Sequence, residues 1–125
     1  MILGIGTDLA VIERVEQALN RHGERFARRI LTSDELVRFG QHAQPAAFLA
    51  KRFAAKEAAA KAIGTGIGAI SWQDLEIRSL PSGAPELILL GAAAERYQQY
   101  DHLVCHLSIS DDAGLAQAFV VLEAR

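Results

Sequence analysis

Residues 45–68 read PAAFLAKRFAAKEAAAKAIGTGIG, and this stretch predicts the element around which the rest of the chain packs. Proline is favoured in the first turn of a helix, and glycines end helices because they adopt positive φ readily. We therefore expect a long helix over 45–63 and a loop at 64–68. Its many alanines, interspersed with larger apolar side chains such as Phe48 and Leu49, allow most of its circumference to pack against neighbours. The helix is predicted to be central.

The flanking segments predict a sheet and shorter helices. Residues 1–9 are apolar and partly β-branched, and Gly4 and Gly6 interrupt the row of side chains, which indicates a strand whose backbone another element approaches closely. Apolar spacing and capping residues predict further helices at 11–22, 24–30, 33–40 and 91–100. Alternation and turn residues predict further strands, with a hairpin formed by the first two, at 72–80, 84–90, 102–109 and 115–123. This order predicts an α+β fold with an antiparallel sheet packed around the long helix.

Length and composition favour one intracellular domain. With 125 residues, 50% of them hydrophobic, the chain can form one packed core, so we expect a single domain over 1–125. The net charge of -2 provides no overall field for nucleic acid or an anionic membrane, and neither partner is expected. The N-terminus lacks the basic region of a signal peptide, and no apolar run approaches the ~18 residues of a membrane helix. The single Cys105 cannot form an intrachain disulfide. We expect a cytoplasmic protein.

Positive charge gathers near the N-terminus. Residues 14–29 contain five arginines and two glutamates, a net charge of +3 within a chain of net charge -2. Arg14 and Arg21 are seven residues apart and therefore share one face of the predicted helix. This face either meets an acidic protein partner or is an ordinary solvated surface.

Three residues are candidates for chemistry. Glu57 and Lys61 are four apart on the long helix and form either an exposed stabilising pair or a metal carboxylate beside a phosphate-binding amine. The loop at 64–68 favours the second interpretation, because the backbone N–H groups of glycine-rich turns can wrap anionic oxygens. Asp8 either caps the next helix or joins Glu57 as the second of two carboxylates that would suffice for Mg²⁺.

Several common site types are disfavoured. The glycines at 64–68 are not followed by the Lys-Ser/Thr of a P-loop, and Leu9 stands where a dinucleotide fingerprint requires a third glycine. His106, Ser108 and Ser110 alternate on one face of a predicted strand, which is neither a nucleophile elbow nor a catalytic triad. The sequence therefore argues against a nucleotide-binding domain of these types and against a serine hydrolase.

Four segments occur together in the order and rough spacing of one family: Gly4-Ile-Gly6-Thr-Asp8-Leu9, Arg52-Phe-Ala-Ala-Lys56-Glu57-Ala-Ala-Ala-Lys61-Ala, Gly64-Thr-Gly66-Ile-Gly68 and His106-Leu-Ser-Ile-Ser110. The chain resembles the bacterial holo-[acyl-carrier-protein] synthases, small 4′-phosphopantetheinyl transferases, over essentially its whole length. The resemblance implies transfer of the 4′-phosphopantetheine arm of coenzyme A to a serine of apo acyl carrier protein, with Mg²⁺. Adenosine 3′,5′-bisphosphate would be released, and the activity would support fatty acid biosynthesis.

The resemblance also implies roles for particular residues. Asp8 and Glu57 match the metal carboxylates of the family, and Lys61 matches its lysine near the phosphates of coenzyme A. Glu57, directly or through a water, is the expected base for the serine proton, with Asp8 as the alternative. Contacts with the adenosine and phosphates of coenzyme A are implied for Arg52, the loop of Gly64 and Gly66, Pro85 and His106.

Partners follow from the same resemblance. Arg14 and Arg21 match basic positions of the family's first helix that meet acidic residues of the carrier protein. The family forms trimers with active sites between subunits, so a homotrimer is expected, and which chain supplies each group stays open, as does the role of Asp111. The alternatives are a transferase of the same kind acting mainly on another carrier and a non-catalytic trimeric module that binds a nucleotide or phosphate.

Overall fold

The computed structural model describes residues 1–125. Its strands are β1 (Ile2–Val11), β2 (Leu75–Ser79), β3 (Pro85–Leu89), β4 (Leu103–Asp112) and β5 (Leu115–Ala124). Its helices are α1 (Ile12–His22), α2 (Glu24–Ile30), α3 (Ser33–Gln41), α4 (Pro45–Ile63), α5 (Gly91–Glu95) and the short 3₁₀ helix η1 (Trp72–Asp74).

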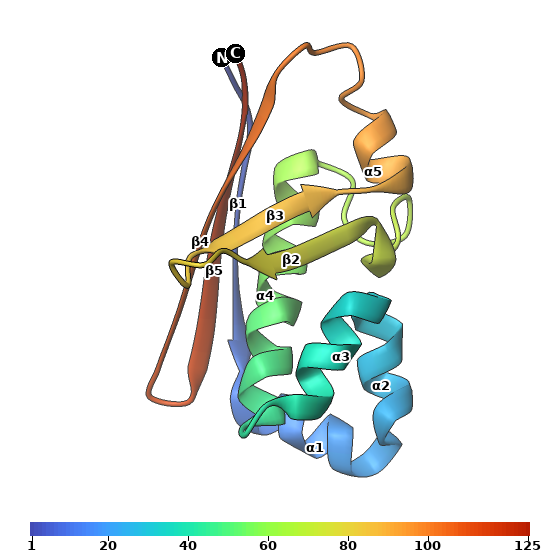
Figure 1. Ribbon diagram of the computed structural model, residues 1–125, viewed down its shortest axis with the longest axis vertical. Helices are drawn as coiled ribbons and strands as arrows, with labels where there is room; N and C mark the ends of the chain where they lie inside the picture. The colour runs from blue at the N-terminus through green and yellow to red at the C-terminus, as the bar shows by residue number, and fades with distance from the viewer.

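The long strands form an antiparallel sheet in the order β1-β5-β4, and β2 and β3 form a separate antiparallel hairpin. Helix α4 runs along one face of the long sheet, the hairpin crosses over α4, and α1, α2 and α3 gather beside one end of α4 (Figure 1). No helix covers the opposite face of the long sheet (Figure 1). The predicted α+β fold, with antiparallel strands packed around a central helix, is confirmed.

Some element boundaries differ from the sequence prediction. The helix expected over 91–100 ends at Glu95, and the chain continues as turns. Residues 72–74, predicted as the start of a strand, form a 3₁₀ turn that precedes β2. Strand β4 continues to Asp112, beyond the predicted end at 109, because residues 110–112 still pair with β5. The two strands meet at a two-residue turn in which Ala113 and Gly114 both have positive φ, a geometry that suits the twist of a hairpin.

Helix α4 is buried around most of its circumference, as its alanines predict. Thirteen of its 19 residues are buried, and Gly64 ends it with a left-handed backbone (φ 93°). Alanine is small enough to admit strands and helices on several sides while still removing apolar area from water. The helix is therefore the common packing partner of β1, β5, α1 and the hairpin.

Strand β1 packs directly on the backbone of α4 through its two glycines. A Cβ atom at Gly4 would lie 1.8 Å from the carbonyl oxygen of Ala62, and one at Gly6 would lie 1.9 Å from that of Ala58. No side chain fits in either space, so the predicted close approach of another element to this strand is confirmed. Because alternate residues of a strand share a face, Asp8 also faces α4.

A buried ion pair joins α3 to α4. The ammonium of Lys56 lies 2.6 Å from Glu35 Oε1, and neither side chain is more than 1% exposed. Glu35 also completes a capping box, because its carboxylate accepts the backbone N–H of Thr32 while the Thr32 hydroxyl accepts that of Glu35. One carboxylate therefore both starts α3 and fixes it to the central helix.

None of the helices is long and apolar enough to cross a membrane.

The packing of β1 on α4 predicts the effect of Gly6→Ala. The added methyl group would overlap the Ala58 carbonyl, so the strand must move away, and we expect the free energy of unfolding to fall by about 3 kcal/mol. Gly40→Ala is the matched control, because Gly40 lies within α3 with open space around its Cβ position, and this change should raise stability by about 0.5 kcal/mol. Urea denaturation would measure the free energy of unfolding of both variants. A Gly6→Ala protein as stable as the Gly40→Ala protein would contradict the packing described.

Candidate active site

Asp8 and Lys61 meet where β1 crosses the last turns of α4. The Lys61 ammonium donates to Asp8 Oδ1 at 3.0 Å and to the Thr7 carbonyl oxygen at 3.0 Å. The Asp8 side chain is only 17% exposed, whereas that of Lys61 is 54% exposed. An amine thus lies at the open side of a largely buried carboxylate.

The alternative in which Asp8 caps the first helix is wrong. Asp8 lies within β1, where it pairs with Ala118 of β5, and the residue that precedes α1 is Val11, whose side chain makes no capping bond. The strand extends two residues further than predicted because Ala10 and Val11 continue the ladder with Ala116 and Leu115.

Glu57 completes the group from α4. Burial raises the pKa of its carboxyl, the nearby negative charge of Asp8 raises it further, and Lys61 lowers it. The simple pairing of Glu57 with Lys61 along the helix does not form, because the ammonium of Lys61 turns to β1 instead. The structure therefore brings Asp8, Glu57 and Lys61 together within one chain, with two carboxylates that repel each other.

This donor set fits a magnesium ion held jointly by protein and substrate. Mg²⁺ is commonly bound through one or two carboxylates together with substrate phosphates and waters. No group of three or more histidines, cysteines, aspartates or glutamates is arranged to enclose a metal. A cation between Asp8 and Glu57 would also relieve the repulsion that raises the pKa of Glu57.

The glycine loop after α4 has a different arrangement from the predicted anion nest. Gly64, Gly66 and Gly68 all have positive φ, between 68° and 136°. Their N–H groups donate within the chain, two of them to the Ala60 carbonyl at the end of α4 and the third to the carbonyl of Ile70. These three N–H groups are therefore already used to shape the loop, and any anion here would have to be met by other groups.

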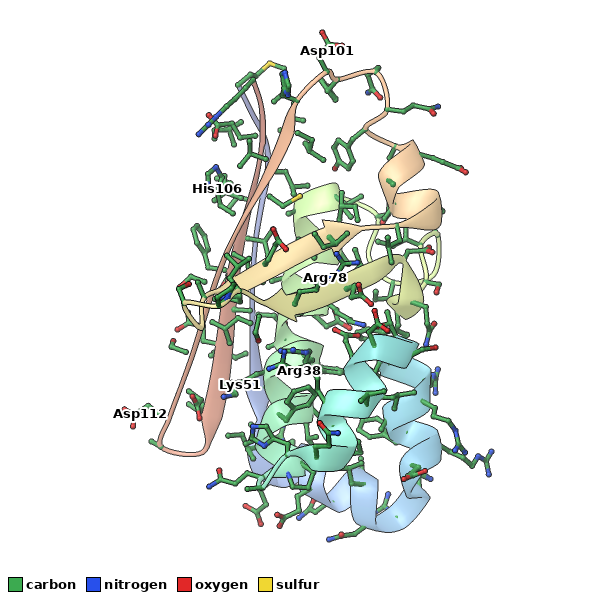
Figure 2. All side chains as sticks on the ribbon, viewed as in Figure 1. Arg38, Lys51, Arg78, Asp101, His106 and Asp112 are labelled. Carbon is green, nitrogen blue, oxygen red and sulfur yellow. The ribbon has the colours of Figure 1, made fainter.

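A separate cleft, lined by several cationic side chains, lies between α3, α4 and the hairpin. This cleft of about 220 Å³ is lined by Arg38, His42, Lys51, Arg52, Pro85 and Asp111, among others. Figure 2 shows Arg38 and Lys51 beside each other at this cleft. The ammonium of Lys51 lies 3.8 Å from Asp111 Oδ1, so Asp111 contacts one of these cations. The charge of the cleft suits a phosphate group.

Arg52 is the most buried cation of this cleft. Its side chain is 8% exposed, its guanidinium carbon lies 4.4 Å from the centre of the Phe48 ring, and Nε and Nη2 are buried without a hydrogen-bond partner. Buried donors are normally satisfied, and unsatisfied ones often mark the place of a missing acceptor. Arg52 and Pro85, both predicted to contact coenzyme A, thus line one cleft.

His106 lies apart from these groups. Its side chain is exposed on the face of the sheet that turns away from α4, where Nε2 is 2.9 Å from Glu123 Oε1 (Figure 2). The predicted alternation of β4 is confirmed, because His106, Ser108 and Ser110 are exposed while the residues between them are partly buried. Within one chain, His106 and the carboxylates of Asp8 and Glu57 are therefore on opposite sides of the sheet.

The same outward face carries exposed apolar side chains. Ile5 is 59% exposed, Leu9 60% and Phe119 45%. They project from β1 and β5, the strands that no helix covers on this side (Figure 1). Exposed apolar groups gathered on one face are typical of a surface that meets another protein.

Arg14 and Arg21 are exposed on α1, and neither has an acidic partner within 4 Å. Helix α2 continues this basic surface with the exposed side chains of Arg25, Arg28 and Arg29. Of the five arginines, only Arg28 is paired, with Glu24 at 3.5 Å. The surface retains a net positive charge.

Sequence reasoning missed the buried pair of Lys56 and Glu35. Lys56 enters the sequence analysis only as one residue of the segment from Arg52 to Lys61, and the helix predicted at 33–40, which contains Glu35, is given no role in charge pairing. The available signal was the position of Lys56 among alanines on a helix predicted to be buried around most of its circumference. A lysine in such a place requires a buried partner.

Comparison with known proteins gives one consistent result. Residues 4–120 match the model of the 4′-phosphopantetheinyl transferase superfamily. The holo-[acyl-carrier-protein] synthase of Vibrio cholerae (strain M66-2) is 56% identical over 126 residues, covering 100% of both chains. That of Shewanella oneidensis is 46% identical over 125 residues, covering 99% of this chain and 98% of the relative.

Solved structures agree with the sequence comparison. The crystal structure of the synthase from Neisseria meningitidis has a TM-score of 0.88 and 44% identity, covering 98% of this chain and 99% of that one. The synthase from Bacillus anthracis, solved in complex with CoA (3′,5′-ADP), has a TM-score of 0.83 and 39% identity, covering 100% and 99%. The chain belongs to the 4′-phosphopantetheinyl transferase superfamily, among the holo-[acyl-carrier-protein] synthases.

Proposed function

We propose that this protein, as one transferase domain over 1–125, transfers the 4′-phosphopantetheine group of coenzyme A to a serine of apo acyl carrier protein in a Mg²⁺-dependent reaction. The serine oxygen bonds to the phosphorus that bears the pantetheine arm, the bond to the bridging oxygen breaks, and adenosine 3′,5′-bisphosphate leaves. The observation that carries the proposal is the convergence of Asp8, Glu57 and Lys61 in a chain of this family. Through its carrier, the activity would support fatty acid biosynthesis in the cytoplasm.

Asp8 and Glu57 are the residues that would hold Mg²⁺. When bound, the ion supplies positive charge at the diphosphate of coenzyme A and offsets charge that builds on the leaving phosphate. The two side chains come from different elements, β1 and α4, which pack without intervening side chains at Gly4 and Gly6. The scaffold therefore holds the carboxylates rigidly, as a phosphoryl-transfer site requires.

Lys61 would stabilise negative charge on the phosphates, and Glu57 would accept the serine proton. The Lys61 ammonium is exposed beyond Asp8, where it can contact a phosphate oxygen and stabilise developing negative charge. Glu57, on α4 beside Asp8 and Lys61, is the proposed acceptor of the serine proton, directly or through a water. Asp8, engaged by Lys61, is the less suitable base.

The remaining contacts to coenzyme A are divided between two sides of the chain. Arg52 and Pro85 line the cationic cleft, and Lys61 with the Gly64–Gly66 segment lies at the end of α4. His106 lies on the outward face of the sheet. We therefore propose a homotrimer whose subunit contacts cover the exposed Ile5, Leu9 and Phe119 and in which His106 completes the site of a neighbouring chain.

The carrier protein would dock on the basic surface of α1. Acyl carriers of this kind provide the acidic residues, and Arg14 and Arg21 provide unpaired cations for them. The charge of this surface, net positive within a chain of net charge -2, supports an electrostatic encounter of this kind.

The transfer reaction is tested by the intact mass of the carrier. Apo acyl carrier protein should gain the mass of one phosphopantetheine with this protein, coenzyme A and Mg²⁺, and none when a chelator is present. Glu57→Gln and Lys61→Ala should abolish or greatly slow the gain. Lys61→Ala should lower folding stability by no more than about 1 kcal/mol, because the ammonium that pairs with Asp8 is 54% exposed. Glu95→Gln and Arg96→Ala, exposed on or beside α5, are controls expected to retain transfer.

An unchanged mass for every apo carrier tested with Mg²⁺ would overturn the catalytic proposal. It would favour a trimeric module that binds a nucleotide or phosphate without chemistry.

Charge reversal tests the carrier surface. Arg14→Glu and Arg21→Glu should each raise the KM for carrier protein about tenfold at low salt, because the docking charge is inverted, with a smaller effect as salt screens it. The KM for coenzyme A should stay the same. Arg96→Glu inverts an exposed cation elsewhere and should leave both constants unchanged. Carrier kinetics indifferent to both α1 reversals would remove this surface from the proposal.

Native mass spectrometry tests the assembly. The wild-type protein should have the mass of three copies. Phe119→Glu should yield monomers without transferase activity, because a charge would be placed in the buried contact. Val37→Glu changes an equally apolar residue that is 61% exposed on α3, and this variant should stay trimeric and active. A wild-type protein that is monomeric at working concentration and fully active would refute the trimer.

A further inference from the structure

Glu35 lies between two buried cations of α4. Its Oε1 atom accepts a hydrogen bond from the ammonium of Lys56 at 2.6 Å, and its Oε2 atom lies 3.5 Å from Nε of Arg52. The side chains are 1% exposed for Glu35, 0% for Lys56 and 8% for Arg52. The three groups together carry one net positive charge, and a further buried carboxylate, Glu76, is close enough to attract both cations. Of the three groups, only Arg52 lines the cationic cleft.

The two cations are held in very different ways. Lys56 uses all three of its donors, which reach Glu35, the carbonyl of Ile30 and the carbonyl of Trp72. Arg52 makes no hydrogen bond to Glu35, and its Nε and Nη2 atoms have no acceptor at all. The charge of Glu35 is thus taken up by Lys56, while Arg52, which lines the cleft, keeps two donors without an acceptor.

Other bonds fix Glu35 in this position. The backbone N–H of Thr32 donates to Oε1 at 2.9 Å, and that of Ile77 donates to Oε2 at 2.9 Å. Bonds from N–H groups complement the negative charge of a carboxylate, and these two hold Glu35 in place with or without Lys56. Without Lys56, the nearest cation to that charge would be Arg52.

We propose that Lys56 and Glu35 are positioning residues for Arg52. Lys56 compensates the charge of the Glu35 carboxylate, and the Arg52 guanidinium is therefore free to bind a phosphate group of coenzyme A. This inference rests on the proposed function. It goes beyond it by assigning a role in substrate binding to a buried pair that does not contact the substrate. A pair with a structural role alone would affect stability and leave the affinity for coenzyme A unchanged.

The proposal predicts an unusual pattern in two variants. In Lys56→Met the uncompensated Glu35 pairs with Arg52, so the KM for coenzyme A should rise about tenfold, with kcat little changed. In Lys56→Met with Glu35→Gln the carboxylate that lies 3.5 Å from Arg52 is removed, and the one that remains nearby, Glu76, is already paired with Arg78 at 2.7 Å. The KM should then return to within about threefold of wild type, since removing both charges of a buried pair is often tolerated. Arg52→Ala gives the reference value for loss of the guanidinium.

Two controls and one replacement variant separate this effect from a loss of fold. The KM for carrier protein should be unchanged in both variants. Leu49→Val removes volume from a fully buried position of α4 and should lower stability without raising the KM for coenzyme A. If Lys56→Met fails to fold, Lys56→Gln repeats the test, because its amide still donates hydrogen bonds but carries no charge.

The outcomes are distinguishable. An active wild-type enzyme whose KM for coenzyme A is the same in the single variant, or equally raised in the single and double variants, would overturn the positioning role. A wild-type protein that transfers nothing would instead overturn the proposed function. Recovery of coenzyme A affinity by the second substitution, seen also in direct calorimetric binding of coenzyme A, is the result that supports the proposal.

Discussion

The close packing of β1 on α4 is the constraint on which the rest of the structure depends. At Gly4 and Gly6 the strand lies against the carbonyl oxygens of Ala58 and Ala62, with no side chain between the two backbones. Because the pleat of a strand places every second residue on the same face, this contact also determines where Asp8 points. The packing of the core and the position of a site carboxylate are thus one feature.

Helix α4 is the main element of the core and also carries buried charged residues. Most of its residues are alanines and other apolar groups, yet Arg52 and Lys56 are also buried within it. A buried charge is tolerated only near an opposite one. Lys56 is paired with Glu35 at 2.6 Å, and Arg52 lies 3.5 Å from the same carboxylate. The helix therefore requires α3 beside it for its charges to be satisfied, which links the small helices to the groups that face the substrate.

The groups expected to contact coenzyme A do not form one continuous pocket in a single chain. The carboxylates lie between sheet and helix, Arg52 faces a cleft below the hairpin, and His106 projects from the far side of the sheet. A sheet three strands wide separates His106 from the others. Contact between copies of the chain is the arrangement that would unite them, and the uncovered apolar face of the sheet supports it.

The sequence by itself determined the local structure and the kinds of residue at the site. Helix propensity, proline and glycine delimited the helix at 45–63, and motif spacing indicated Asp8, Glu57 and Lys61, because these properties act over a few neighbouring residues. Only the tertiary structure decided partners that are distant in sequence. Lys61 pairs with Asp8 across 53 positions instead of with Glu57 four away, and Lys56 pairs with Glu35 across 21. These pairings depend on which elements the core brings into contact. The distance between two such side chains in space cannot be read from their separation along the sequence.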